Sequence, residues 1–241
     1  MSIDGSASQP NNADIRQGII KRAIQLGFQF SILAAILFLS SGRLDWWMAW
    51  LYLGIFVVGI GINTFFLMRT RPELIAERAA RGEDTKGWDK IVGGLYGLFS
   101  ALLLPLVAGL DMRFDWPPPI PLGIQVIGLL LTIVGFGFAS WAMISNAYFA
   151  GTVRIQKERG HAVCDTGPYR LVRHPGYSGW MLGLVAMSLM LGSLWALIPA
   201  ALAIITLIIR TAFEDRTLQT ELPGYADYAQ HTRYRLLPGI W

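Results

Sequence analysis

Residues 156–177 read QKERGHAVCDTGPYRLVRHPGY and form the longest punctuated polar segment of an otherwise apolar chain. The segment ends in RHPGY (173–177), which places a cation, an imidazole and a phenol directly before an apolar run. Proline is favoured at the first position of a helix, because its missing N–H group has no partner there anyway. We therefore expect a helix that begins at Pro175, with His174 at its cap and backbone N–H groups that suit a carboxylate or phosphate. The alternative is that Arg173 and His174 only anchor the next membrane span at the cytoplasmic surface.

The composition is that of a membrane protein. Hydrophobic residues make up 54% of the chain, charged residues only 15%, and the mean hydropathy is +0.45, which excludes an ordinary soluble domain. Several apolar runs approach or exceed the roughly 20 residues that cross a bilayer. We expect spans at 19–39, 46–68, 91–110, 122–145, 177–191 and 194–209. The first span is too long for a cleaved signal peptide, and the polar residues 1–12 before it are expected to be disordered. The predicted fold class is thus all-α, a polytopic membrane bundle of about six transmembrane helices.

The basic residues follow the membrane and do not form a nucleic-acid footprint. Loops on one side carry Arg16, Lys21, Arg22, Arg69, Arg71, Arg78, Arg81, Lys86, Lys90, Arg154, Lys157, Arg159, Arg170, Arg173, Arg210, Arg216, Arg233 and Arg235. The opposite side carries only Arg43 and Arg113. By the positive-inside rule both termini are cytoplasmic, in a bacterial inner membrane, or in the endoplasmic reticulum of a eukaryote. We expect contact with membrane lipid, no nucleic acid and no obligatory protein partner.

The chain divides into two regions. Residues 1–145 hold four spans and a short interfacial helix at 71–82, whose Leu74 and Ile75 are expected to rest on the inner leaflet. Residues 146–241 hold the polar segment, a helical hairpin and a tail. The single cysteine excludes a disulfide within the chain and a cysteine cluster for a metal, so no metal site is expected.

The last two spans are short, because about 15 residues rise only about 22 Å against a hydrocarbon thickness of about 30 Å. Apart from an early proline, nothing interrupts the helical pattern of the last span before residue 221, so this helix should extend into the cytosol. Arg210 and Glu214 are four positions apart and share a face of that extension. They form either a surface ion pair or two separate ligand contacts. In an antiparallel hairpin they meet His174 and Tyr177, which gives a cytoplasm-facing pocket for a zwitterionic cofactor and an anionic, lipid-tailed substrate.

From Gln156 to the C-terminus the chain resembles the isoprenylcysteine carboxyl methyltransferase family and the related membrane phospholipid methyltransferases. The matching elements, in order, are Gln156 with HAVC (161–164), GPY (167–169), RHPGY (173–177), Arg210 with Glu214, Asp215 and Leu218, and a tail with Gly224, Tyr225, Tyr228, Arg233, Arg235 and PGI (238–240). Upstream, AER (76–78) and DTKGWD (84–89) resemble bacterial members. One departure is visible, since the paired glutamates of the family read Glu214-Asp215 here.

The resemblance implies that residues 146–241 bind S-adenosyl-L-methionine and release S-adenosyl-L-homocysteine. The cofactor-binding residues that it implies are Gln156, His161, Ala162, Val163, Cys164, Tyr169, His174, Pro175, Gly176, Tyr177 and Glu214. It also implies that Arg210 faces the substrate as the catalytic residue. Cys164 is expected to pack within the site and not to act as a nucleophile.

The expected reaction is methylation of the carboxylate of a prenylated cysteine or a similar lipophilic acid. A carboxylate is already ionised near neutral pH, so it needs no general base, and Arg210 can hold it through two parallel hydrogen bonds. Three alternatives stay open: a phospholipid amine N-methyltransferase, a sterol-reductase-like enzyme that uses NADPH, and a non-enzymatic membrane protein in which Arg210 and Glu214 merely pair. The apolar tail, residues 225–241, is predicted to be a lid.

Overall fold

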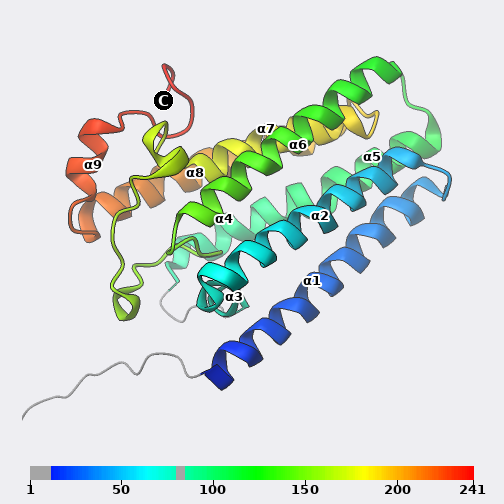
Figure 1. Ribbon diagram of the computed structural model, residues 1–241. Coiled ribbons are helices and arrows are strands. Elements are labelled where there is room, and N and C mark those ends of the chain that lie inside the picture. The colour runs from blue at the N-terminus through cyan, green and yellow to red at the C-terminus, as the bar shows by residue number, and fades with distance from the viewer. Residues whose placement is uncertain (1–11, 80–84) are drawn as a thin grey trace, which may run out of the picture.

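The computed structural model describes residues 12–79 and 85–241, and every regular element in these ranges is a helix (Figure 1). The molecule is a polytopic membrane helix bundle, as the sequence predicted. The expected disorder of residues 1–12 falls outside the described residues, apart from Asn12 at the start of α1. The final residues of the expected helix at 71–82 also lie outside them.

Five helical segments are long and apolar enough to cross a membrane. They are α1 (Asn12–Ser41), α2 (Trp47–Thr70), the continuous segment Gly87–Phe114, α6 (Leu122–Ser145) and α8 (Leu197–Glu221). The sixth expected span is α7 (Pro175–Met190), whose 16 residues make it shorter than these five. It packs along α6 and leads through a tight turn into α8 (Figure 1). The last hairpin is therefore asymmetric, with one short helix and one that extends well past the apolar run.

The third span is not a uniform α-helix. It consists of α4 (Gly87–Gly97), the π-helical stretch η1 (Leu98–Leu103) and α5 (Leu104–Phe114). Pro105 lacks an N–H group and cannot donate to the carbonyl of the preceding turn, which explains a local change of helix type just before it. Tyr96 and Ser100, on either side of the start of η1, line an internal cavity that is considered below.

Two glycines let α6 and α7 approach each other closely. A Cβ atom on Gly179 would lie 2.6 Å from the carbonyl oxygen of Gly135, and a Cβ atom on Gly135 would lie 2.7 Å from that of Gly179. No side chain fits at either position without pushing the helices apart. This contact fixes the start of α7 relative to the end of α6, and so positions the polar segment between them.

The short helix α3 (Pro72–Ala79) packs against protein. Leu74 is fully buried and Ile75 nearly so, in a cluster with Leu67 of α2, and a Cβ atom on Gly18 of α1 would meet Ala76 at 2.5 Å. The expectation that this apolar face rests on the inner leaflet is therefore wrong. Close packing of α3 against α1 buries this face within the protein.

The remaining elements gather at one end of the bundle. Residues 146–174 run through the short 3₁₀ turns η2 (Lys157–Arg159) and η3 (Gly167–Arg170) and then enter α7 at Pro175, as predicted. After α8 the chain turns into α9 (Tyr225–His231) and the tail. Figure 1 shows α3, α9, the C-terminus and the start of α1 at this same end.

Candidate active site

A cavity lies at this end of the bundle, enclosed by the 146–174 segment, the first turns of α7, the C-terminal half of α8, and α9. Arg210 and every predicted cofactor residue except Pro175 line it. Pro175 is buried in the first turn of α7 and does not reach the cavity. Residues that are widely spaced in sequence are thus brought together around one space, and their roles there stay predictions.

The side chain of Gln156 forms part of the cavity wall. It is almost completely buried, its amide nitrogen donates to the carbonyl of Tyr148 at 2.8 Å, and its amide oxygen accepts from Arg159 at 2.5 Å. Both ends of the amide therefore already have partners. Gln156 therefore holds the loop in shape.

His161 is a neutral side chain at this site. Its Nδ1 accepts a hydrogen bond from the backbone N–H of Gln156 at 3.3 Å, and its ring stacks on Tyr148 with centroids 4.5 Å apart. Burial, together with the charges of Arg159 and Arg154, lowers the pKa of His161 to about 4. The imidazole can therefore accept the N–H bond of the loop at neutral pH without carrying a charge.

The extended stretch after His161 leaves backbone groups open. Within the described part of the chain, the N–H and C=O groups of Ala162, Val163 and Cys164 make no backbone hydrogen bond. The thiol of Cys164 lies 3.6 Å from the carbonyl oxygen of Ser145, which is consistent with a packed side chain. Because backbone groups require partners when they are covered, this edge offers donors and acceptors to a ligand in the cavity.

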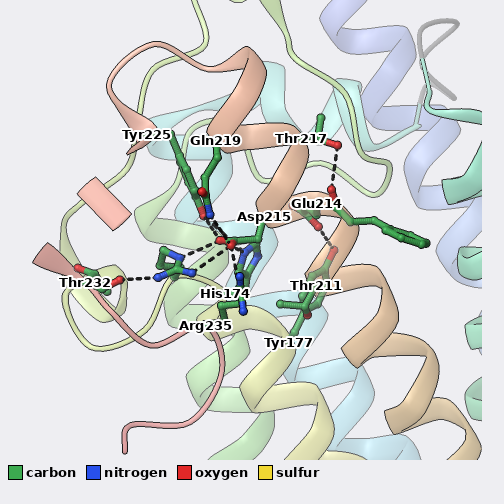
Figure 2. A network of polar contacts seen from close by, with 12 residues as sticks. His174, Tyr177, Thr211, Glu214, Asp215, Thr217, Gln219, Tyr225, Thr232 and Arg235 are labelled. Atoms are coloured by element: carbon green, nitrogen blue, oxygen red, sulfur yellow. Dashed lines mark hydrogen bonds and ion pairs between the residues drawn. The ribbon is translucent and has the colours of Figure 1, made fainter. Parts of the chain in front are cut away.

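Glu214 projects from α8 into the cavity and bonds to α7. Its Oε2 accepts a hydrogen bond from the hydroxyl of Tyr177 at 2.5 Å (Figure 2). The ring of Tyr177 stacks on that of His174, with centroids 5.8 Å apart and planes at 3°. Among the described residues no cation pairs with Glu214, so its half-buried carboxylate can bind an ammonium group or hydroxyls.

Arg210 is paired with Asp89 and not with Glu214. Its Nε donates to Oδ1 of Asp89 at 2.7 Å, and its Nη2 donates to Oδ2 at 3.1 Å and to the carbonyl of Gly151 at 2.9 Å. Arg210 and Glu214 therefore do not form the surface ion pair that was one of the two possibilities. The predicted two-bond grip on a substrate is also not available as expected, because Asp89 occupies that edge of the guanidinium. Only Nη1 makes no hydrogen bond within the described residues.

Asp89 itself was not among the predicted site residues. It lies in the first turn of α4, is 3% exposed, and its Oδ2 also accepts the backbone N–H of Val153 at 2.8 Å. It therefore links the third span to the 146–174 segment and to α8. The signal that could have identified it is an acidic residue at the start of an apolar span, where an unpaired charge is costly.

The second carboxylate of the pair, Asp215, points away from the cavity and is fully buried. It accepts two hydrogen bonds from Arg173, at 2.7 and 3.0 Å. It also accepts one from Nε of Arg235 at 2.8 Å and one from the hydroxyl of Tyr225 at 3.1 Å (Figure 2). The guanidinium nitrogens of Arg173 all donate within this cluster, so Arg173 is not free to bind a ligand. Asp215 is a structural centre that joins α7, α8 and the tail.

The tail forms part of the site. The backbone N–H groups of Arg173 and His174 donate to the carbonyls of Tyr234 and Arg235, each at 2.9 Å. Further along the cavity, the hydroxyl of Tyr228 donates to the carbonyl of Tyr169 at 2.7 Å. Tyr225 and Tyr228 both line the cavity, and sequence analysis had quoted them only as part of a matching tail. The tail thus covers one side of the cavity, while its function as a lid stays a prediction.

Comparison with known proteins connects this site to a family. Residues 124–222 match the family described as phospholipid methyltransferase. This segment, 99 of the 241 residues, is similar to that family. It contains α7, most of the cavity lining and both Arg210 and Glu214, whereas Asp89 and the tail beyond residue 222 lie outside it.

The chain is also similar to several curated proteins. A probable protein-S-isoprenylcysteine O-methyltransferase is 30% identical over 115 residues in each of two subspecies of Oryza sativa, indica and japonica, covering 44% of this chain and 58% of the relative. The cobalt-zinc-cadmium resistance protein CzcN of Cupriavidus metallidurans is 32% identical over 125 residues, covering 50% of this chain and 51% of that protein. The chain therefore spans between half and three fifths of the length of these relatives.

The residues present fit the cofactor that such a domain implies. S-adenosyl-L-methionine has an adenine edge that forms hydrogen bonds, and the open backbone edge at Ala162, Val163 and Cys164 matches it in kind. It also has an ammonium group, for which the unpaired carboxylate of Glu214 is suited. The cavity supplies both kinds of group in one space.

Proposed function

We propose that the chain is a membrane methyltransferase that binds S-adenosyl-L-methionine in this cavity and methylates the carboxylate of a prenylated cysteine or a similar lipophilic acid. The observation that carries this proposal is the convergence of Glu214, Arg210 and the open backbone edge on one cavity. The names of the Oryza sativa relatives support the choice of acceptor. S-adenosyl-L-homocysteine is then the released product.

The protein contributes binding and orientation to this reaction. When bound, the cofactor supplies an electrophilic methyl group on a sulfonium. Glu214 holds the ammonium or ribose hydroxyls, and the hydroxyl of Tyr177 holds Glu214 in place. The 162–164 edge fixes the base. Because an acid acceptor is already ionised, the chain's residues need not remove a proton from it.

Arg210 acts on the acceptor through the part of its guanidinium that Asp89 leaves free. Nη1 can donate to one oxygen of the acceptor carboxylate, while the bonds from Nε and Nη2 to Asp89 keep the group rigid. The guanidinium carbon lies 5.6 Å from the centroid of the Tyr177 ring, so the cation and the Tyr177–Glu214 pair face the same space. Alignment and exclusion of water from the carboxylate would supply most of the rate enhancement.

We also propose that the cavity faces the cytoplasm and that both termini lie on that side. The arrangement is supported by the concentration of basic residues in the segments at the cavity end. Arg43 and Arg113 belong to the opposite end, where a Cβ atom on Gly42 would lie 3.5 Å from the guanidinium of Arg113. In this topology a lipophilic acceptor approaches from the bilayer and the cofactor from the cytosol.

A second candidate is methylation of a phospholipid amine. The family match by name favours it, and so does the short Tyr177–Glu214 hydrogen bond. An amine acceptor must lose a proton, and Glu214 is a carboxylate placed where it can accept one. The two candidates thus differ in whether Glu214 acts as a base.

The chemical stability of the transferred methyl group separates these candidates. Detergent-purified protein is incubated with methyl-labelled S-adenosyl-L-methionine and either N-acetyl-S-farnesylcysteine or phosphatidylethanolamine. The main proposal predicts label in an ester that alkali releases as methanol, and only with the first acceptor. Alkali-stable label in the phospholipid head group supports the second candidate instead. Calorimetric binding of NADPH in place of S-adenosyl-L-methionine overturns both.

A further inference from the structure

A cavity of about 200 Å³ lies between α1, α2, α3 and α6, and two arginines line it. Arg22 comes from α1 and Arg78 from α3, and both are half-buried. Arg22 donates to the amide oxygen of Gln25 at 3.4 Å, and Arg78 donates to the backbone carbonyl of Phe149 at 3.2 Å. Neither arginine forms an ion pair with a carboxylate in the described part of the chain. Two positive charges therefore share this cavity with only neutral acceptors.

This placement favours a bound counter-ion. Glu77, which precedes Arg78 in the chain, pairs with Arg154 at 2.6 Å instead. Burial, together with the nearby charge of Arg22, lowers the pKa of Arg78 to about 10, so Arg78 still carries its charge at neutral pH. Two like charges in a partly desolvated space repel each other, and an anion bound between them relieves that repulsion. The cavity is therefore suited to an anionic group.

The cavity also holds an unpaired hydrogen-bond acceptor. The side-chain nitrogen of Asn63 donates to the carbonyl of Gly59 and to the hydroxyl of Ser140, both at 2.9 Å, which fixes the orientation of the amide. Its oxygen Oδ1 is buried and has no partner among the described residues. A buried acceptor normally has a donor, so the anion that fits here carries an N–H or O–H group beside its charge.

The polar groups of the cavity lie at one level of the bundle. Three helices contact the buried face of α3 through one residue each, namely Ile19 of α1, Leu67 of α2 and Met143 of α6. Arg22, Asn63 and Ser140 lie three or four positions from these contacts, in each case toward the middle of the helix. That spacing is about one turn, or roughly 5 Å along each axis. The polar level thus begins one turn inside the cluster on α3.

The next turn toward the middle of the bundle is apolar. It contributes Leu26, Ile60 and Phe136 to the wall of the same cavity. Phe136 also lines the apolar cavity of about 430 Å³ at Tyr96 and Ser100. Charged groups toward the membrane surface and apolar groups toward its centre match the order of head group and acyl chain in a phospholipid. A soluble anion would need only the polar level.

We propose that this cavity binds a phospholipid whose head group carries a hydrogen-bond donor, at a site separate from the candidate active site. The phosphate binds Arg22 and Arg78, a head-group donor binds Asn63, and the start of an acyl chain lies on the apolar turn. The lipid is not the methyl acceptor, because these three residues do not line the active-site cavity. It ties α1 to α3 and, through the bond of Arg78 to Phe149, to the segment before α7.

Equilibrium binding of phosphatidylglycerol tests the site without methyl transfer. This lipid has a phosphate and head-group hydroxyls, but neither an amine nor a carboxylate that could be methylated. It is titrated into protein purified in neutral detergent, and bound lipid is counted by native mass spectrometry beside a titration with diacylglycerol of the same chains. We expect Arg22→Gln and Arg78→Gln each to weaken the tightest phosphatidylglycerol site about tenfold and to leave diacylglycerol unchanged, because only the phosphate meets the charge.

A matched variant separates this site from general attraction of anionic lipid to a basic surface. Arg69 is exposed in the last turn of α2 and does not line the cavity. Arg69→Gln removes the same charge and should bind phosphatidylglycerol like the wild type. A loss as large as that of Arg22→Gln, or equal losses for phosphatidylglycerol and diacylglycerol, overturns the proposal.

Two further probes test the donor and the lipid. Phosphatidylmethanol keeps the charge of phosphatidylglycerol and lacks its hydroxyls, so the wild type should prefer phosphatidylglycerol and Asn63→Leu should lose that preference. Equal affinity of the wild type for both lipids overturns the contact with Asn63. Inorganic phosphate and glycerol phosphate should compete poorly, because they cannot occupy the apolar turn. Displacement of the lipid by either of them at equal concentration assigns the cavity to a soluble anion and overturns the lipid.

Thermal unfolding distinguishes a ligand site from a structural role of the arginines. Without added lipid, Arg22→Gln should unfold no earlier than the wild type, because it removes one of two repelling charges. Phosphatidylglycerol should then raise the unfolding temperature of the wild type more than that of the variant. A variant that is destabilised without lipid and gains as much from lipid as the wild type contradicts the proposal. Should Arg78→Gln not fold, Arg22→Gln and the charge-preserving Arg78→Lys decide, the latter by retaining most of the affinity.

Discussion

Asp89 in α4 and Arg210 in α8, which are 121 positions apart, form a buried ion pair through two hydrogen bonds of 2.7 and 3.1 Å. The pair joins the third span to the segment that matches the family, because Asp89 lies outside the family match and Arg210 inside it. It also decides which part of Arg210 remains free for a substrate.

Asp89→Asn should be strongly destabilising. The change keeps the shape but leaves the guanidinium of Arg210 buried without its charge partner, and breaking such a pair typically costs about 3–5 kcal/mol. Thermal unfolding in detergent measures this loss. Lys90→Gln, which removes an exposed charge from the same helix, is the control and should have little effect. If both changes leave the unfolding temperature unaltered, the ion pair does not hold the two parts together.

Arg210→Lys should reduce turnover and leave cofactor affinity nearly unchanged. An ammonium keeps the charge, but it cannot keep two bonds to Asp89, one to Gly151 and still donate to the acceptor in a fixed direction. A methyl-transfer assay beside calorimetric titration with S-adenosyl-L-methionine makes the comparison. Turnover equal to that of the wild type would argue against any contact between Arg210 and the acceptor.

Asp215→Asn should release the tail. The substitution leaves Arg173 and Arg235 facing a neutral group at a fully buried position, and the bonds that hold residues 232–235 near α7 weaken. We expect faster proteolysis beyond residue 225 and weaker cofactor binding, because Tyr225 and Tyr228 line the cavity. Arg235→Gln, at a partly exposed position, should show the same changes to a smaller degree. A tail that becomes protease-sensitive while cofactor affinity is retained would show that it does not cover the cofactor.

His161 should make the protein sensitive to mild acid. Its pKa is about 4 in the folded protein and about 6.5 when exposed, so the unfolded chain binds the proton more readily between these values. The stability that neutral His161 contributes is therefore complete above about pH 6.5 and is lost as the pH falls towards 4. In His161→Asn, whose side-chain oxygen can still accept the N–H of Gln156, this part of the pH dependence should disappear. Parallel unfolding curves for the two proteins between about pH 7 and pH 4 would contradict it.

Local signals in the sequence were sufficient for the fold. The apolar lengths predicted the long spans, Pro175 predicted the start of α7, and the uninterrupted helical pattern before residue 221 predicted the extension of α8, which ends at Glu221. Where a helix begins and ends depends on the backbone preferences of residues close together in the sequence. The length of a span depends on the thickness of the membrane. The covering of α3 was not predictable in this way, because it depends on the packing of Gly18 against Ala76 between two distant helices.

The sequence predicted most of the residues that line the cavity, but it did not predict how they pair. The motif residues line one cavity. Their spacing does not predict that Arg210 forms an ion pair with Asp89, or that Asp215 forms one with Arg173 and contacts the tail. Such choices depend on which charges meet once the helices have packed. Periodicity along α8 shows only that Arg210 and Glu214 share a face.

Calorimetric titration of the wild type and Glu214→Gln with S-adenosyl-L-methionine tests the central claim most directly. The account predicts that the wild type binds the cofactor and that Glu214→Gln binds it about 10- to 100-fold more weakly, since a charge-assisted hydrogen bond contributes about 1.5–3 kcal/mol. Asp227→Asn, an exposed carboxylate on α9 outside the cavity, should bind like the wild type. Absence of binding in the wild type, or equal affinity of wild type and Glu214→Gln, would contradict the assignment of this cavity to the cofactor.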